Sequence, residues 1–225
     1  MQTVYYIHMR NHLAGVLLPF LGFLSPIALA AQQPLSAPAH SAAMESHEGV
    51  TISVEPWIHA SQYKEKFPKK SPFNGGVVAL KVTFQNNSDE SVKVNLQRIR
   101  LVVILGEENR QELVPLTPDD VADTVLLKGG KDPTTRRNPL PIPIGKPNPS
   151  RDKNWTDFRD ASQNAALPSP VVAAHSSMDG LVYFDMRSEW DLLQNARLYI
   201  PNLETMSTHT PLSYFEIELG RASSN

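Results

Sequence analysis

The sequence predicts an all-β fold in which two sheets pack face to face around one core. Short segments of alternating apolar and polar residues recur between residues 50 and 219, and this pattern is typical of half-buried strands. The chain has room for about seven such strands. The alternation also changes parity in mid-chain, which favours strands that pass from one sheet to the other.

The first strands are expected between residues 50 and 96. Residues 50–54 alternate cleanly, and the apolar side chains of residues 77–84 lie at even positions from 78 onward. Residues 86–90 are rich in turn formers, and residues 91–96 resume the alternation at even positions. The sequence therefore predicts a hairpin in which residues 77–84 pair with residues 91–96.

The parity reverses after this hairpin. Apolar side chains occupy even positions in residues 92–96 but odd positions in residues 99–105. A slip of one residue turns every side chain to the other face of a sheet. We therefore expect a bulge or a strand break near residues 97–98.

Further strands and two helical turns are expected in the rest of the chain. Thr117 precedes a proline and two aspartates, which is typical of a helix N-terminus. Ser188 is the expected cap of a second helical turn, and residues 181–184 are apolar on both faces. Strand-like patterns occur at residues 110–116, 181–184, 196–200 and 215–219.

The first thirty residues have the features of a cleavable export signal. Arg10 is followed by an apolar run at residues 13–24, and Ala28-Leu29-Ala30 has the small residues of a cleavage site. Pro19 interrupts the run, which is also shorter than the roughly 20 apolar residues of a membrane span. We therefore expect a signal peptide over residues 1–30 and a periplasmic or extracellular protein without a transmembrane span after cleavage.

Two boundaries follow from this signal. Residues 31–48 are rich in Ala, Ser, Pro and Gln, so a flexible leader is expected there, followed by a β-sandwich domain over residues 49–221. Translation from Met9 instead of Met1 would place Arg10 directly after the start, and both starts remain open.

Composition excludes several classes of function. The chain has no cysteine, which excludes disulfides, thiolate metal sites, cysteine nucleophiles and a lipid-anchored cysteine. The formal net charge is −2, so a general nucleic-acid-binding protein is not expected. A hydrophobic content of 41% is enough for a packed core.

Residues 128–153 differ from the rest of the chain. Frequent prolines exclude regular helix and internal sheet pairing there. The segment holds two aspartates and seven basic residues, Lys128, Lys131, Arg136, Arg137, Lys146, Arg151 and Lys153. One interpretation is an arm that contacts an anionic partner; the other is a solvated insertion.

A helix is expected after the basic segment. Ser150 is the expected cap, and Trp155, Phe158, Ala161 and Ala165 share one stripe of the helix.

No catalytic motif is present in the sequence. His175, Ser176 and Asp179 have the residue types of a hydrolase triad, but near-neighbours along a strand end do not converge on one atom. The aspartates after Thr117 lack the glycine and spaced ligands of a calcium loop. We therefore expect neither an enzyme nor a bound cofactor or metal.

Four segments together resemble exported bacterial immunoglobulin-like domains of unknown function. They are residues 82–89 (VTFQNNSD), 92–94 (VKV), 177–184 (SMDGLVYF) and 196–201 (ARLYIP). The resemblance implies an immunoglobulin-like two-sheet sandwich outside the cytoplasm and assigns no functional residue.

These observations favour an exported, non-catalytic interaction module whose partner is an unknown protein or an anionic component of the cell envelope. Two alternatives remain. One is a β-sandwich hydrolase in which the carboxylates of Asp179, Asp185 and Glu189 converge. The other is an assembly or chaperone subunit that acts by strand addition at an open sheet edge.

Overall fold

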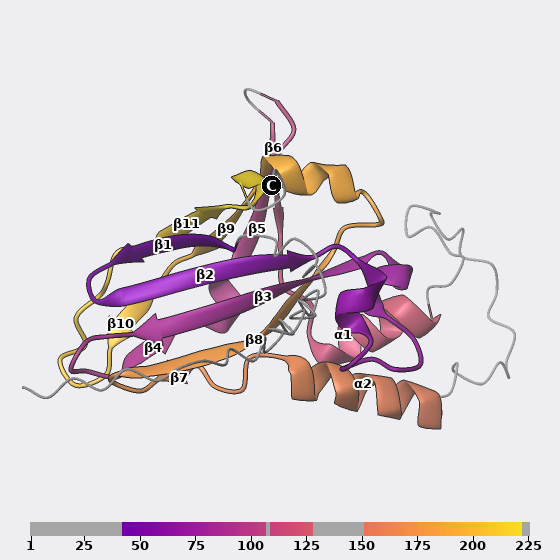
Figure 1. Ribbon diagram of the computed structural model, residues 1–225, viewed down its shortest axis with the longest axis horizontal. Helices are drawn as coiled ribbons and strands as arrows, with labels where there is room; N and C mark the ends of the chain where they lie inside the picture. Colours follow the sequence, from indigo (N-terminus) through magenta and orange to yellow (C-terminus); the bar gives the residue numbers. More distant parts are fainter. Residues whose placement is uncertain (1–41, 107–108, 128–150, 222–225) are drawn as a thin grey trace, which may run out of the picture. The chain divides into compact units, whose positions relative to one another are not determined.

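The computed structural model describes residues 42–106, 109–127 and 151–221, which all belong to one compact unit. This part of the chain is mostly β, with three antiparallel sheets and a few short helices (Figure 1). The predicted export signal, residues 1–30, lies outside the described residues.

The largest sheet has the strand order β1-β2-β3-β8. Its central pairings are long, because β2 pairs with β3 from Val50 opposite Asn86 to Trp57 opposite Ala79, and β3 pairs with β8 along ten residues. The strands of this sheet are β1 (Ala43–His47), β2 (Val50–Trp57), β3 (Val77–Asn86) and β8 (Ser176–Asp185).

The other two sheets contain shorter strands. The three-stranded sheet has the order β10-β4-β7, with β4 (Val92–Val94), β7 (Val171–Val172) and β10 (Leu203–Thr205). The four-stranded sheet has the order β11-β9-β5-β6, with β5 (Arg100–Ile104), β6 (Arg110–Leu113), β9 (Ala196–Ile200) and β11 (Phe215–Glu218).

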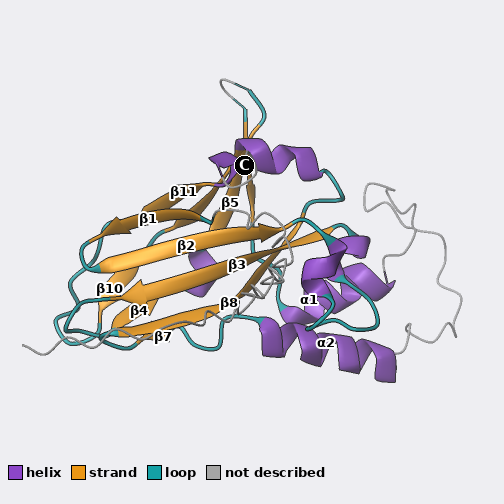
Figure 2. Ribbon diagram, in the orientation of Figure 1, coloured by secondary structure: helices purple, strands orange, loops and turns teal. Residues whose placement is uncertain are grey.

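The helices gather mainly at one end of the largest sheet (Figure 2). There lie two 3-10 turns, η1 (Ala60–Tyr63) and η2 (Pro72–Gly75), helix α1 (Pro118–Ala122), a π turn (Asp123–Leu127) and helix α2 (Lys153–Ala165). Three further 3-10 turns are η3 (Leu96–Arg98), η5 (Trp190–Asn195) and η6 (Leu219–Arg221).

The main hydrophobic cluster lies between the sheets. Even-numbered side chains of β2 and β3 point into it, as the alternation predicts, and meet side chains from the two smaller sheets. Its largest fully buried members are Ile52, Leu80, Phe84, Ile99, Leu101, Phe184, Leu198, Ile200, Leu203 and Phe215.

A second cluster covers the opposite face of the largest sheet, at the end where the helices lie. Trp57 of β2, Val77 and Ala79 of β3, and Leu181 and Tyr183 of β8 contribute to it from the sheet. Its helical and loop members are Tyr63, Phe67, Val121, Ala122, Val125, Trp155, Phe158 and Ala165. Residues 181–184 are apolar on both faces because both faces of β8 are covered at this point.

The predicted break in the alternation is confirmed. The 3-10 turn η3 (Leu96–Arg98) separates β4 from β5, and these two strands belong to different sheets. The change of parity therefore marks the point at which the chain crosses from one sheet to another.

The predicted hairpin of residues 77–84 with 91–96 is wrong. β3 pairs with β2 and β8, whereas β4 pairs with β10 and β7. The turn between them is organised by the buried side chain of Asn86, whose amide nitrogen donates to Glu90 O at 2.7 Å and to Ala173 O at 3.1 Å. Asn86 thereby turns the chain away from its own sheet and ties it to the segment after β7.

The number of strands also exceeds the prediction, because the described residues contain eleven. β7 and β10 are too short to show an alternation. β1 lies at residues 43–47, so the prediction of a flexible leader over residues 31–48 is wrong there. Glu48 and Gly49 join β1 to β2 with φ of 51° and 78°, which is the backbone of a tight hairpin turn.

β1 is held against the edge of the sheet that contains β11. Glu45 accepts a hydrogen bond from the backbone N–H of Glu216, and Glu48 accepts one from that of Ser213, both at 2.7 Å. The imidazole of His47 stacks on Phe215, with 3.8 Å between ring centroids. We call this contact the β1–β11 seam; it joins the edges of two sheets through side chains.

The crossing from α2 to β8 requires a glycine. Gly180 lies in β8 opposite Val82, and a Cβ atom at this position would lie 2.6 Å from the backbone of Leu167. The chain that leaves α2 therefore passes directly over β8, which brings the helices close to the sheet.

Candidate functional site

The helical end of the largest sheet contains the described part of the basic segment, and its local structure follows from helix capping. Thr117 accepts a hydrogen bond from the backbone N–H of Asp120 and begins α1, as predicted. α2 begins differently: Asp152 accepts from the backbone N–H of Trp155 at 2.9 Å. The cap is therefore Asp152 and not Ser150, which lies outside the described residues.

The predicted apolar stripe of α2 faces the sheet. Trp155, Phe158 and Ala165 are buried in the second cluster, and Ala161 packs against it. The second helical turn, by contrast, is not capped as predicted. η5 follows Glu189, which makes no capping contact through its side chain, and Ser188 has a φ of 66°.

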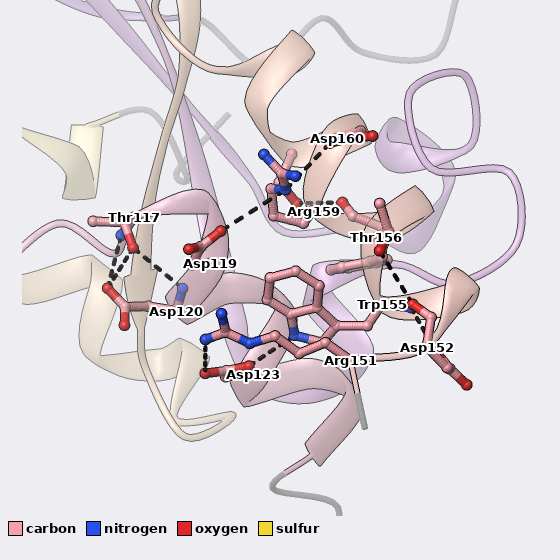
Figure 3. Close-up of polar contacts among 12 residues, drawn as sticks. Thr117, Asp119, Asp120, Asp123, Arg151, Asp152, Trp155, Thr156, Arg159 and Asp160 are labelled. Atoms are coloured by element: carbon pink, nitrogen blue, oxygen red, sulfur yellow. Dashed lines mark hydrogen bonds and ion pairs between the residues drawn. The ribbon is translucent and has the colours of Figure 1, made fainter. Parts of the chain in front are cut away.

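A cation–aromatic cluster links α2 to the π turn (Figure 3). The indole N–H of Trp155 donates to Asp123 at 2.7 Å, and the Arg151 guanidinium lies 4.4 Å above the Trp155 ring. Arg151 also forms an ion pair with Asp123 at 3.6 Å. Arg159, one turn after Trp155, forms ion pairs with Asp119 and Asp160. Arg151, near the end of the basic segment, is thus bound to the π turn through Asp123 and to α2 through Trp155.

The structure describes two of the seven predicted contact residues. Arg151 is held in the cluster above, and Lys153 is exposed at the first position of α2. The other five lie outside the described residues: Lys128, Lys131, Arg136, Arg137 and Lys146. The last described residue before them is Leu127 in the π turn, and the first after them is Arg151.

A cavity of about 390 Å³ is lined in part by Leu126 and Asn154, which are close in sequence to Leu127 and Arg151. Aromatic and aliphatic side chains form much of its wall, and two lysines stand at it. It is lined by Phe67, Pro68, Lys69, Lys70, Leu126, Asn154, Asp157, Phe158 and Ala161. We call it the Phe67–Phe158 pocket, after two rings that lie 5.5 Å apart between centroids.

The two lysines are held to the elements on either side of this pocket. Lys69 forms an ion pair with Asp157 of α2 at 3.4 Å. Lys70 donates to the carbonyl of Val125 in the π turn at 2.8 Å. Sequence reasoning missed both lysines, although four lysines occur within residues 64–70. That cluster was the available signal.

The three carboxylates proposed for a hydrolase, those of Asp179, Asp185 and Glu189, do not converge on one place. Asp179 and Asp185 lie six residues apart on β8, opposite Thr83 and Val77 of β3, and this spacing corresponds to roughly 20 Å along a strand. Asp185 and Glu189 line a separate cavity of about 400 Å³ near β6. His175 Nε2 lies 2.9 Å from a carboxylate oxygen of Asp89.

The aspartates that follow Thr117 each have a partner in the chain. Asp119 pairs with Arg159, Asp120 with Thr117, and Asp123 with Trp155 and Arg151. Within the described ranges, no three His, Asp or Glu side chains are grouped as metal ligands would be. None of the helices in these ranges has the length and apolar character needed to cross a membrane.

No protein-family model matches the chain, and no curated protein matches it. A crystal structure of a functionally unknown protein from Listeria monocytogenes EGD-e is similar with a TM-score of 0.34 and 17% sequence identity. That match covers 72% of this chain and 71% of the Listeria chain.

Proposed function

We propose that this protein is an exported, non-catalytic module of the cell envelope or periplasm that binds an anionic lipid surface through its helical end. One observation carries the proposal. Lys69 and Lys70 line an apolar pocket to which Leu126 and Asn154 also contribute, and these two residues lie next to the two ends of the basic segment in the sequence. A lipid surface offers both negative charge and apolar chains, so it matches both parts of this site.

Electrostatics support this choice of partner. A basic residue close to an anionic membrane contributes about 1 kcal/mol to binding. Lys69, Lys70 and Lys153 belong to this end of the described chain, and the basic segment adds five more cations by sequence. Asp157 offsets part of the charge of Lys69, so the segment and the lysines are expected to act together.

Two observations support a non-catalytic module over the alternatives. The candidate acids Asp179 and Asp185 are far apart on one strand, which does not favour a carboxylate hydrolase. Strand addition needs a free sheet edge. Both edges of the largest sheet are partly occupied: β1 by the β1–β11 seam, and β8 by backbone pairing with Leu116 and Ala166.

The proposal includes an immunoglobulin-like two-sheet sandwich, as in the exported bacterial domains that the sequence resembles. Its support is the main hydrophobic cluster, in which the largest sheet packs against strands of the two smaller sheets. A three-stranded and a four-stranded sheet together would then form the second layer.

Vesicle co-sedimentation tests the proposed function. The chain without residues 1–30 is mixed with vesicles of phosphatidylcholine alone or with added phosphatidylglycerol. We expect binding only to the anionic vesicles and weaker binding at higher salt. The double variant Lys69→Glu/Lys70→Glu should bind at least about tenfold more weakly.

The matched control is Arg98→Glu/Arg110→Glu, which changes the net charge equally at two exposed positions outside the helical end. It should bind nearly as the unmodified protein does. Equal binding to both kinds of vesicle, or equal loss in both double variants, would contradict the proposal. Binding to a protein of the envelope in place of the vesicles would replace lipid by protein as the partner.

A further inference from the structure

The Phe67–Phe158 pocket has the dimensions and chemistry of a small-molecule site. Its volume of about 390 Å³ lies in the usual range for such sites. The rings of Phe67 and Phe158 line it together with Leu126 and Ala161. These four side chains come from three separate segments of the chain. An apolar chain that enters it would be removed from water on several sides, which is favourable in proportion to the buried area.

The polar groups at this pocket favour a negative charge. Lys70 donates one hydrogen bond, to Val125 O, and an ammonium group has three donors. Lys69 is largely exposed and forms an ion pair with Asp157 at 3.4 Å. With two ammonium groups and one carboxylate, the lining side chains have a net positive charge.

Two other cavities differ in this respect. The cavity of about 370 Å³ beside β8 has no charged side chain in its lining. The cavity of about 400 Å³ near β6 is lined by Glu112, Asp185 and Glu189 together with Arg187. The Phe67–Phe158 pocket thus combines an apolar wall with a positive edge, and these two do not.

We propose that the Phe67–Phe158 pocket binds a single-chain anionic amphiphile, with the acyl chain in the cavity and the anionic headgroup on Lys69 and Lys70. The inference deepens the proposed function and rests on it for the anionic, lipid-like nature of the ligand. Phe67, Phe158 and Ala161 contact the chain, and the two lysines select the headgroup. The ligand is a single molecule in a pocket, which differs from attraction to a charged surface.

Calorimetric titration with dodecanoate, below its micellar concentration, tests this inference on the chain without residues 1–30. We expect saturable binding of dodecanoate. Dodecyltrimethylammonium has the same chain with a cationic head and should bind at least about tenfold more weakly. Acetate, which has the head without the chain, should show no binding.

Two pairs of variants locate the site. Ala161→Trp fills the pocket and should weaken dodecanoate binding at least about tenfold, whereas Asn164→Trp, on the exposed face of the same helix, should not. Lys69→Met/Lys70→Met should remove the preference for dodecanoate over the cationic amphiphile. The control Lys64→Met/Lys66→Met, in the same loop but outside the pocket lining, should retain it. The lysine pair keeps the test valid if Ala161→Trp does not fold.

Several results would overturn the inference. Undetectable dodecanoate binding does so directly, and equal effects of Ala161→Trp and Asn164→Trp place the ligand elsewhere. Binding that appears only after deletion of residues 131–149 would make this chain's own segment the occupant.

Two further results separate this inference from the proposed function. Anionic vesicle binding without dodecanoate binding would reject the pocket and retain the proposed function. Dodecanoate binding without vesicle binding would reject the membrane surface and retain the pocket.

Discussion

The main hydrophobic cluster lies between the sheets, and the second cluster lies beneath the helices. Both include residues of β3 and β8, but different interactions hold them together. The cluster between the sheets is mostly aliphatic and consists of side chains on strands whose backbones pair with one another. The cluster beneath the helices is rich in aromatic rings, and individual polar atoms connect its parts. We therefore expect the first to respond to lost volume and the second to lost hydrogen bonds.

Three side chains, which make four hydrogen bonds, illustrate the second mode. The Tyr63 hydroxyl donates to Trp57 O at 2.8 Å and accepts from the N–H of Ala79 at 2.9 Å. The Tyr183 hydroxyl donates to Ser162 O at 3.1 Å. Burial raises the pKa of both tyrosines above the ordinary value. The third side chain is Trp155, whose indole N–H donates to Asp123.

The largest effect is expected for Phe84→Ala in the cluster between the sheets. Phe84 is fully buried, and truncation of a buried phenylalanine costs about 3–5 kcal/mol of unfolding free energy. Urea unfolding measures this change. Gln85→Ala, at the next and exposed position, should alter the unfolding free energy by less than about 0.5 kcal/mol. Similar losses at both positions would refute the assignment of the two faces of β3.

Tyr63→Phe should have the largest effect of a single polar atom beneath the helices. The change conserves the ring but leaves a carbonyl of Trp57 and an N–H of Ala79 without this partner, at a cost of about 1–3 kcal/mol. Thermal unfolding measures the loss. The control Tyr214→Phe removes an exposed hydroxyl and should have no effect. If Tyr63→Phe is as stable as the unmodified protein, polar anchoring is not what distinguishes the second cluster.

Asp123→Ala should have a smaller effect at the same end. It removes the acceptor of the Trp155 indole and the ion-pair partner of Arg151, for a loss of about 1 kcal/mol. Hydrogen exchange of α2 amides gives a local measurement, because the loss should appear in α2 and not in β5 or β9. Glu65→Ala, an exposed acidic position in the neighbouring loop, is the control. Uniform loosening of the whole domain would contradict a local role.

The smallest effect is expected at the β1–β11 seam, where it depends on pH. The hydrogen bond from Ser213 N–H lowers the pKa of Glu48 below its ordinary value of 4.5. A lowered folded-state pKa means that the charged group stabilises the fold above pH 4.5 and that this contribution disappears as pH falls through the folded-state pKa. Glu48→Gln should therefore lower the Tm slightly at pH 7.

At pH 3 the Tm difference between Glu48→Gln and the unmodified protein should shrink. Glu65→Gln, outside the seam, should show the same Tm as the unmodified protein at both values of pH. A difference for Glu48→Gln that grows on acidification would contradict the role of the charged carboxylate in the seam.

Sequence reasoning was most effective where a local pattern has one physical interpretation. The alternation in β2 and β3 predicted which side chains are buried, and the change of parity predicted the break at η3. The stripe from Trp155 to Ala165 predicted the buried face of α2. In each case, neighbouring residues of one element carry the signal.

Pairings between distant segments were not predictable in this way. The turn after β3 has the composition of a hairpin, yet Asn86 uses its side chain to bind a segment more than 80 residues later. The pocket presents the same difficulty. Lys69 and Lys70 meet α2 and the π turn only through contacts across 88 and 55 residues of sequence.

For this protein, the order of apolar and polar side chains by itself determined most of the strands, which of their faces are buried and where α1 begins, but not the short strands β1, β7 and β10. Only the tertiary structure decided which strands become neighbours, and that the loop of residues 64–70 forms a pocket with α2. The reason is physical. Local periodicity depends on the geometry of a single element, whereas strand pairing and pockets depend on which of many apolar surfaces bury one another best.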